Sequence, residues 1–220
     1  MTRCTRSKTG TALRRSLQVA FALAWLGSAS SARADGEVAA AKATMQHTVD
    51  DTLAILNDKS LSPDARKAKL ENIAVDRFDF AVMAQLVLGK NRTSLNPDQQ
   101  KQFLDEFRKH LSLTYGRTFD RYTGAEKIAL GEGRLEANKD VTLRMTITGG
   151  SAPPDGVRID YRMRAADDKW FVIDVIPEGV SIVQNFRSQV QEIVSQKGVA
   201  NLIQTLHDKN ASEAQAQPPG

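Results

Sequence analysis

The sequence predicts an α+β fold, in which helices at both ends of the chain wrap a twisted antiparallel sheet of about four strands. Apolar residues recur every three or four positions up to about residue 119, which is the period of a helix. After Gly124 they alternate with polar residues, as in strands with one buried face. The helical period returns after Pro177. Because one sheet face is apolar, helices must cover it.

Four helices are expected before the sheet, at 37–57, 62–76, 79–88 and from 96 onwards. Ser62 and Asn96 each precede a proline, as N-cap residues do before a proline at the first helical position. Gln99 stands where a capping box requires it, and Gly89 ends the third helix. The long helix carries an aromatic and leucine stripe that curls around its axis: Phe103, Phe107, Leu111, Tyr115 and Phe119.

Four strands are expected at 126–133, 140–148, 157–165 and 169–177. The second and third alternate strictly between apolar and polar residues, so each has one dry face. The fourth is nearly continuous in apolar residues and should be covered on both faces. Helices at 181–196 and 199–206 follow.

The first 34 residues have the pattern of a secretory signal. A basic start is followed by an apolar run at 17–29 and by Ala32-Arg33-Ala34, an A-x-A exit site. We expect cleavage after Ala34, export to the periplasm, one domain over 35–209, and a disordered tail over 210–220, which is rich in Ala, Gln and Pro.

Charge and cysteine content exclude several classes of function. The signal segment holds six of the 30 basic residues and none of the 26 acidic ones, so the mature chain is close to neutral and gives no electrostatic case for binding nucleic acid. The single cysteine, Cys4, also lies in that segment, so the mature chain has no disulfide or thiolate. His47, His110 and His207 lie on separate predicted helices without metal-site spacing. We therefore expect no metal and no cofactor.

Two polar features leave other functions open. Asp174, in the apolar fourth strand, could be the general base of an enzyme, or a structural carboxylate held by Arg187 or by backbone N–H groups. His110 is expected to be a solvated helix residue. Four arginines on the polar sheet face could form a docking surface of a periplasmic scaffold or interaction protein, or simply face water: Arg144, Arg158, Arg162 and Arg164.

The order and spacing of several short motifs resemble the MlaC (toluene-tolerance) family from about residue 40 to residue 207. At Asn91 the chain departs from the family, which has an aromatic residue there. These motifs do not separate the hopanoid-associated subgroup from the rest of the family. The motifs are Phe78-Asp79-Phe80, Leu88-Gly89, Phe103, Phe107, Tyr115-Gly116, Tyr161-Arg162, Trp170, Asp174-Val175, Glu178-Gly179-Val180-Ser181 and Asn185-Phe186-Arg187.

The resemblance implies a sheet wrapped by helices around a deep apolar lipid cavity. It implies a non-enzymatic carrier of a phospholipid or a hopanoid-like lipid, which shuttles between an inner-membrane ABC transporter bearing an MCE-domain protein and an outer-membrane lipoprotein complex. An enzyme on an NTF2-like fold, with Asp174 as base, and a scaffold are the alternatives.

The candidate lipid-binding residues come from the apolar sheet face and from the helices expected to cover it. The same periodicity would also suit side chains that simply pack against one another as core, since an amphipathic pattern does not distinguish a filled interior from a cavity. The candidates are Met83, Val87, Tyr115, Phe119, Leu143, Met145, Ile147, Ile159, Tyr161, Met163, Val183 and Phe186.

Overall fold

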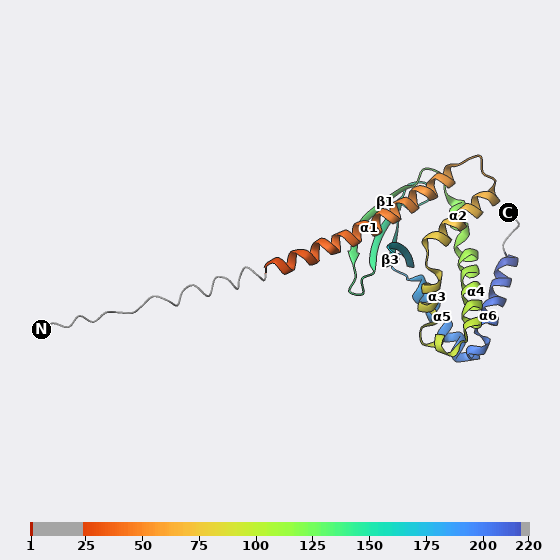
Figure 1. Ribbon diagram of the computed structural model, residues 1–220. Helices are drawn as coiled ribbons and strands as arrows, with labels where there is room; N and C mark the ends of the chain where they lie inside the picture. The colour runs from red at the N-terminus through yellow and green to blue at the C-terminus, as the bar shows by residue number, and fades with distance from the viewer. Residues whose placement is uncertain (2–23, 217–220) are drawn as a thin grey trace. The chain divides into compact units, whose positions relative to one another are not determined.

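The computed structural model describes Met1 and residues 24–216, with side chains from Ala34 onwards (Figure 1). The chain divides into two compact units, Met1–Glu37 and Val38–Gly220. Helix α1 (Ala24–Asn57) contains the boundary between them and also the predicted cleavage point after Ala34. Most of the predicted signal segment lies outside the described residues. Among the described helices, none is both long and apolar enough to cross a bilayer.

Three further helices precede the sheet, and the start signals predicted for two of them and the end predicted for the other are confirmed. Helix α2 (Pro63–Arg77) begins after Ser62, whose Oγ accepts a hydrogen bond from the backbone N–H of Ala65. Helix α3 (Phe80–Leu88) begins after Asp79 and ends at a glycine with φ of 53°. Helix α4 (Pro97–Tyr115) begins with the predicted reciprocal capping box of Asn96 and Gln99. These local signals placed the helix ends because they depend on neighbours in sequence.

Two 3₁₀ helices, η1 (Gly89–Ser94) and η2 (Gly116–Arg121), follow α3 and α4. Helix α4 therefore ends at Tyr115, and Phe119, the last residue of the predicted stripe, lies in η2.

The sheet has the order β1-β2-β3-β4, and every neighbouring pair is antiparallel. Its strands are β1 (Lys127–Leu135), β2 (Val141–Thr148), β3 (Val157–Ala166) and β4 (Lys169–Pro177). The free edge of β4 is joined by a parallel bridge from Phe78, the residue between α2 and α3. The backbone N–H of Asp79 donates to the carbonyl oxygen of Val172 at 3.0 Å, which fixes the start of α3 against the sheet.

Helices α5 (Ile182–Lys197) and α6 (Leu202–Ala216) complete the fold after the short η3 turn (Val199–Asn201). The prediction of a disordered tail from 210 onwards does not hold for 210–216, which continue α6. The reason is Asn210, a fully buried side chain that is hydrogen-bonded to Glu106 and His110 of α4. Residues 217–220 lie outside the described part of the chain.

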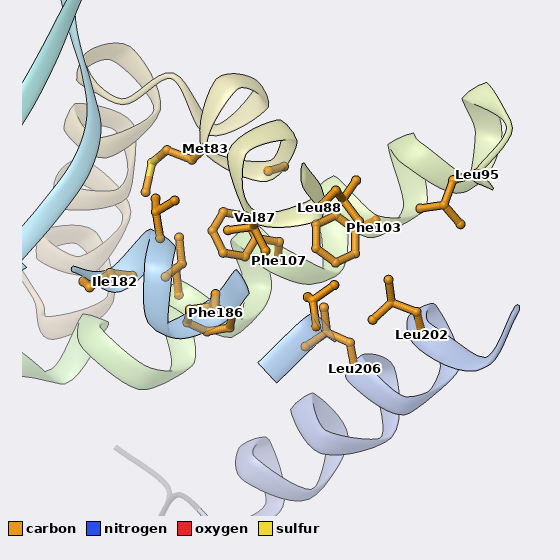
Figure 2. Close-up of a cluster of buried hydrophobic side chains, with 14 residues drawn as sticks. Met83, Val87, Leu88, Leu95, Phe103, Phe107, Ile182, Phe186, Leu202 and Leu206 are labelled. Atoms are coloured by element: carbon orange, nitrogen blue, oxygen red, sulfur yellow. The ribbon is translucent and has the colours of Figure 1, made fainter. Parts of the chain in front are cut away.

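Buried apolar side chains form two clusters. The first, the helical core, joins α3, α4, α5 and α6 (Figure 2). Phe103 and Phe107 stack at 6.1 Å between ring centroids, and Phe186 meets Phe107 edge-on at 5.3 Å. Leu202 and Leu206 bring α6 against the same cluster. The last helix is therefore part of the core of this unit.

The second cluster, the sheet core, places helix α1 on the apolar face of the sheet. Ala41 and Met45 of α1 pack with five buried strand residues, namely Val141, Leu143, Met163, Trp170 and Val172. Half-buried Phe78 and Val175 pack against both clusters and so connect the two cores.

Candidate functional site

The apolar face of the sheet is closed at one end and only partly covered at the other. Strand pairing places the alternating apolar residues of all four strands on this face. The sheet core closes one end under α1. Towards the other end of the face, the apolar side chains keep some accessible surface, although they are of the same type as the buried ones. We call this set the partly covered section: Ile128, Leu130, Ile147, Val157, Ile159, Tyr161 and Val175.

Six predicted lipid-binding residues lie on this face, and they divide between its two ends. Leu143, Met145 and Met163 are buried, whereas Ile147, Ile159 and Tyr161 belong to the partly covered section. The boundary between the two ends therefore runs between paired residues: buried Leu143 stands directly opposite half-buried Tyr161, and buried Met145 stands opposite half-buried Ile159. That half-buried apolar surface is available to a ligand without unfolding any strand.

Tyr161 is unusual within the section because it is both deep and accessible. Desolvation raises the pKa of its phenol to about 12, which requires dense surrounding protein. The side chain nevertheless keeps accessible surface. Among the residues that the structure describes, none forms a hydrogen bond with its hydroxyl. The hydroxyl can therefore be reached by a partner that is not part of the described protein.

Four predicted helical residues lie inside the helical core. Met83 and Val87 come from α3, and Val183 and Phe186 come from α5, with exposed fractions between 0% and 4%. Figure 2 labels Met83, Val87 and Phe186 within this cluster. In this structure they pack mainly against other apolar side chains, as in a filled core. Their contact with a ligand stays a prediction.

A groove of about 510 Å³ lies between α4, α5 and α6, a size within the usual range of ligand pockets. Two predicted residues, Tyr115 and Phe186, line it. Tyr115 is 37% exposed, and the remaining predicted residue, Phe119, is 42% exposed. The other lining residues carry polar side-chain groups: His110, Thr114, Asn185, Gln189, Lys209, Ser212 and Glu213.

A chain of buried polar contacts beneath this groove fastens α6 to α4. His110 Nδ1 lies 2.7 Å from Asn210 Oδ1, and the Asn210 amide donates to Glu106 Oε2 at 2.8 Å. The prediction that His110 is solvated is wrong, because its side chain is 4% exposed and its ring meets Phe186 edge-on at 4.9 Å. Burial is the main cause that lowers the pKa of His110. No local sequence signal marks these residues, since their partners lie about 100 positions apart.

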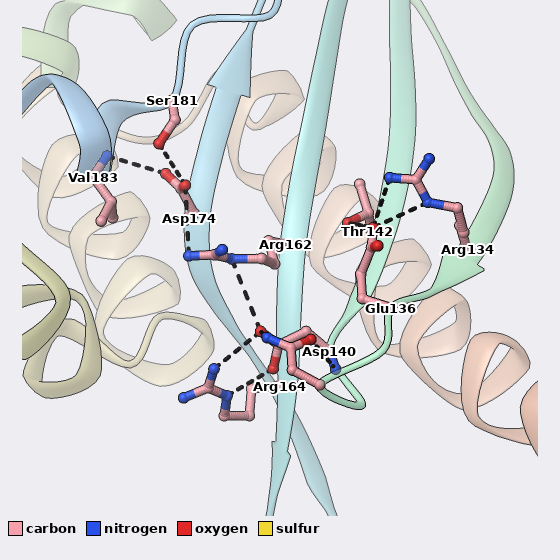
Figure 3. Close-up of polar contacts among 10 residues, drawn as sticks. Arg134, Glu136, Asp140, Thr142, Arg162, Arg164, Asp174, Ser181 and Val183 are labelled. Atoms are coloured by element: carbon pink, nitrogen blue, oxygen red, sulfur yellow. Dashed lines mark hydrogen bonds and ion pairs between the residues drawn. The ribbon is translucent and has the colours of Figure 1, made fainter.

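Asp174 is a structural carboxylate that caps helix α5 (Figure 3). Its Oδ2 accepts from the Ser181 hydroxyl at 2.6 Å, and its Oδ1 accepts from the backbone N–H of Val183 at 3.1 Å. The side chain is 2% exposed. The charged partner is Arg162, 3.8 Å away on the neighbouring strand, and not Arg187, which instead packs against Gly89. Both oxygens are therefore already occupied, which does not suit a general base.

The arginines of the opposite sheet face are paired with carboxylates. Arg144 forms a bidentate pair with Asp160, with both distances 2.8 Å. Arg164 forms another with the fully buried Asp140, at 2.7 and 3.0 Å (Figure 3). Arg158 lies 3.6 Å from Glu178. Asp140 was not predicted from the sequence. These pairs largely neutralise the face that the sequence suggested for docking.

No three His, Cys, Asp or Glu side chains of residues 34–216 gather in a way that could hold a metal ion. What this site offers instead is apolar strand surface with one free phenol, beside helices joined by buried polar contacts. That combination defines a class of binding fold in which shape and hydrophobicity hold a ligand.

Residues 46–208 match the family described as MlaC protein, and the chain belongs to this family. It is 28% identical to a phospholipid-binding protein from Ralstonia solanacearum, solved in complex with a phospholipid. That structure superposes with a TM-score of 0.70 and covers 79% of this chain and 98% of its own.

A curated relative, toluene tolerance protein ttg2D of Pseudomonas putida, is 23% identical over 119 residues. The match spans 53% of this chain and 53% of the relative, so the chain spans about half the length of that protein. These comparisons confirm the MlaC resemblance and the α+β fold predicted from the sequence. They do not separate the hopanoid-associated subgroup from the rest of the family.

Proposed function

We propose that the chain is a periplasmic lipid carrier, which holds a membrane lipid by its acyl chains and carries it between the two membranes. The observation on which this proposal rests is the partly covered section of the sheet, an apolar surface that the fold leaves accessible next to a sealed core. The phospholipid bound to the Ralstonia relative, which is 28% identical over nearly its whole length, supports the same conclusion.

The energetic need for such a carrier follows from the hydrophobic effect. A diacyl lipid carries roughly 30 methylenes, and exposing each to water costs about 0.8 kcal/mol, so free transfer through water costs on the order of 20 kcal/mol. A protein surface that replaces the bilayer for those methylenes removes most of that barrier. Binding must also be reversible, which suits a site made of apolar contacts with few directional bonds.

Transport direction would then depend on partners and not on this chain. The sequence contains no phosphate-binding loop of the G-x-x-x-x-G-K-[ST] type. We propose that lipid is exchanged with an inner-membrane ABC transporter bearing an MCE-domain protein and with an outer-membrane lipoprotein complex. Export would follow cleavage of the signal after Ala34.

Two neighbouring substitutions on β3 test where the lipid binds. Ile159→Trp adds bulk on the apolar face within the partly covered section, whereas Arg158→Trp adds the same side chain on the opposite, exposed face. We expect the first variant to lose most of the lipid recovered by solvent extraction of the purified protein, and the second to keep it. Circular dichroism melting checks that both fold. Equal lipid content in the two folded variants would contradict the proposed location.

The proposed partners require a separate test. Donor vesicles carrying the inner-membrane transporter and acceptor vesicles carrying the outer-membrane complex are mixed with a labelled phospholipid in the donor. Addition of the purified chain should accelerate the appearance of label in the acceptor, and Ile159→Trp should not. An unchanged transfer rate with the wild-type chain would refute the shuttle between these complexes.

A further inference from the structure

The partly covered section contains one polar group that the fold leaves without a partner, the hydroxyl of Tyr161. Strand pairing places Tyr161 between Leu143 of β2 and Val175 of β4. Its neighbours on the same face of β3 are Ile159 and Met163. All of these neighbours are apolar. A phenol within a folded protein usually finds a hydrogen-bond partner, and each exception requires an explanation.

Space for a partner exists beside this hydroxyl. The side chain keeps accessible surface, and its oxygen is not among the sealed, unpaired polar atoms of the described residues, which are Nε of Arg66 and Nε of Arg162. The ring is nevertheless deep enough for desolvation to raise its pKa to about 12, so the phenol stays protonated and remains a donor at any physiological pH.

We propose that the Tyr161 hydroxyl donates a hydrogen bond to an ester carbonyl oxygen of the bound lipid and so selects lipids with ester-linked acyl chains. This inference rests on the proposed function as a lipid carrier. A single neutral donor matches a carbonyl, which needs only one hydrogen bond. A phosphate group would need several donors or a cation, and the partly covered section contains no charged side chain.

The consequence is discrimination between lipid classes inside an otherwise apolar site. Ester-linked diacyl lipids supply a carbonyl acceptor, whereas ether-linked lipids offer only the weaker ether oxygen and polycyclic hydrocarbon rings offer no acceptor. One hydrogen bond of this kind corresponds to a preference of about twofold to tenfold. The site would then favour phospholipids over hopanoid-like lipids through Tyr161.

The test uses the purified chain and vesicles that contain equal amounts of a diester phospholipid and its diether analogue, with the same headgroup and chain length. After exchange, the chain is separated from vesicles and both bound lipids are quantified by mass spectrometry. The wild type should be enriched in the diester lipid by about twofold to tenfold. Tyr161→Phe should bind lipid with a ratio near unity, because the ring volume is kept and only the donor is lost.

A matched control removes another phenol hydroxyl. Tyr122→Phe loses a hydrogen bond to Asn57 Oδ1, 3.2 Å long and outside the partly covered section, and should keep the wild-type ratio. The melting temperature of Tyr161→Phe should not fall, since its hydroxyl has no partner among the described residues.

The inference would be overturned by a wild-type ratio near unity, by a wild-type ratio retained by Tyr161→Phe, or by a clear fall in the melting temperature of that variant. Complete loss of lipid by a folded Tyr161→Phe would also overturn it, because one hydrogen bond cannot account for such a loss. If the wild type binds neither lipid, the proposed function itself fails, which separates the two conclusions.

Discussion

Replacing Asp174 by alanine tests whether this carboxylate is structural. The substitution leaves the backbone N–H of Val183 without its acceptor and the Ser181 hydroxyl without its 2.6 Å partner, both at the first turn of α5. It also removes a carboxylate 3.8 Å from Arg162 on the neighbouring strand. Because the site is buried, water does not easily replace these contacts.

The expected cost follows from those contacts. Two hydrogen bonds to a buried charged group and the loss of a charged neighbour give about 2–4 kcal/mol of destabilisation. For a domain of this length that corresponds to a fall in melting temperature of about 5–15 °C. Thermal unfolding followed by circular dichroism measures it directly, with urea titration as a second route.

A control variant separates burial from charge. Asp105→Asn removes a carboxylate that pairs with Lys101 at 2.9 Å on the exposed side of α4, and it should change the melting temperature by about 1–2 °C at most. If Asp174→Ala melts within that same small interval, the assignment of Asp174 as a structural cap is refuted and the catalytic alternative regains support.

Three other results are expected. Burial lowers the pKa of His110 in the folded protein, so the unfolded chain binds a proton at this residue more readily. The free energy of unfolding should therefore be highest above about pH 6.5 and fall as the pH drops further. Melting temperatures at pH 7.5 and 5.5 should differ less for His110→Gln than for the wild type, and an identical difference would contradict this. Gly133→Ala should lower the free energy of unfolding, measured in urea, by about 1–3 kcal/mol, because the new Cβ would lie 2.6 Å from side-chain atoms of both Leu143 and Val38. An unchanged free energy of unfolding would contradict this and show that the two side chains move aside without cost. Intact-mass measurement of the exported chain should give a first residue directly after Ala34, and a retained segment would refute the predicted cleavage.

The sequence predicted the elements of this fold because their signals are local. Ser62 and Asn96 cap helices through residues three positions away, and the strict alternation in β2 and β3 has one structural solution, a strand with one buried face. The partner of Asp174 could also have been predicted, since Arg162 stands directly opposite it once β3 and β4 are paired.

Other features could not be predicted from the sequence, because they depend on contacts between residues that are far apart in the chain. His110 sits next to exposed Lys109 on α4 and is buried only because α6 brings Asn210 to it. The two ends of the apolar sheet face have similar residues, yet only one is sealed by Ala41 and Met45 of α1. Whether such a face closes or stays open is decided by the helices above it.

Native mass spectrometry of the wild-type chain, purified from cells that export it, tests the central claim most directly. The carrier account predicts a protein mass with an added lipid whose fragments include ester-linked acyl chains. A folded protein that shows only its own mass, from cells rich in phospholipid, would contradict the account.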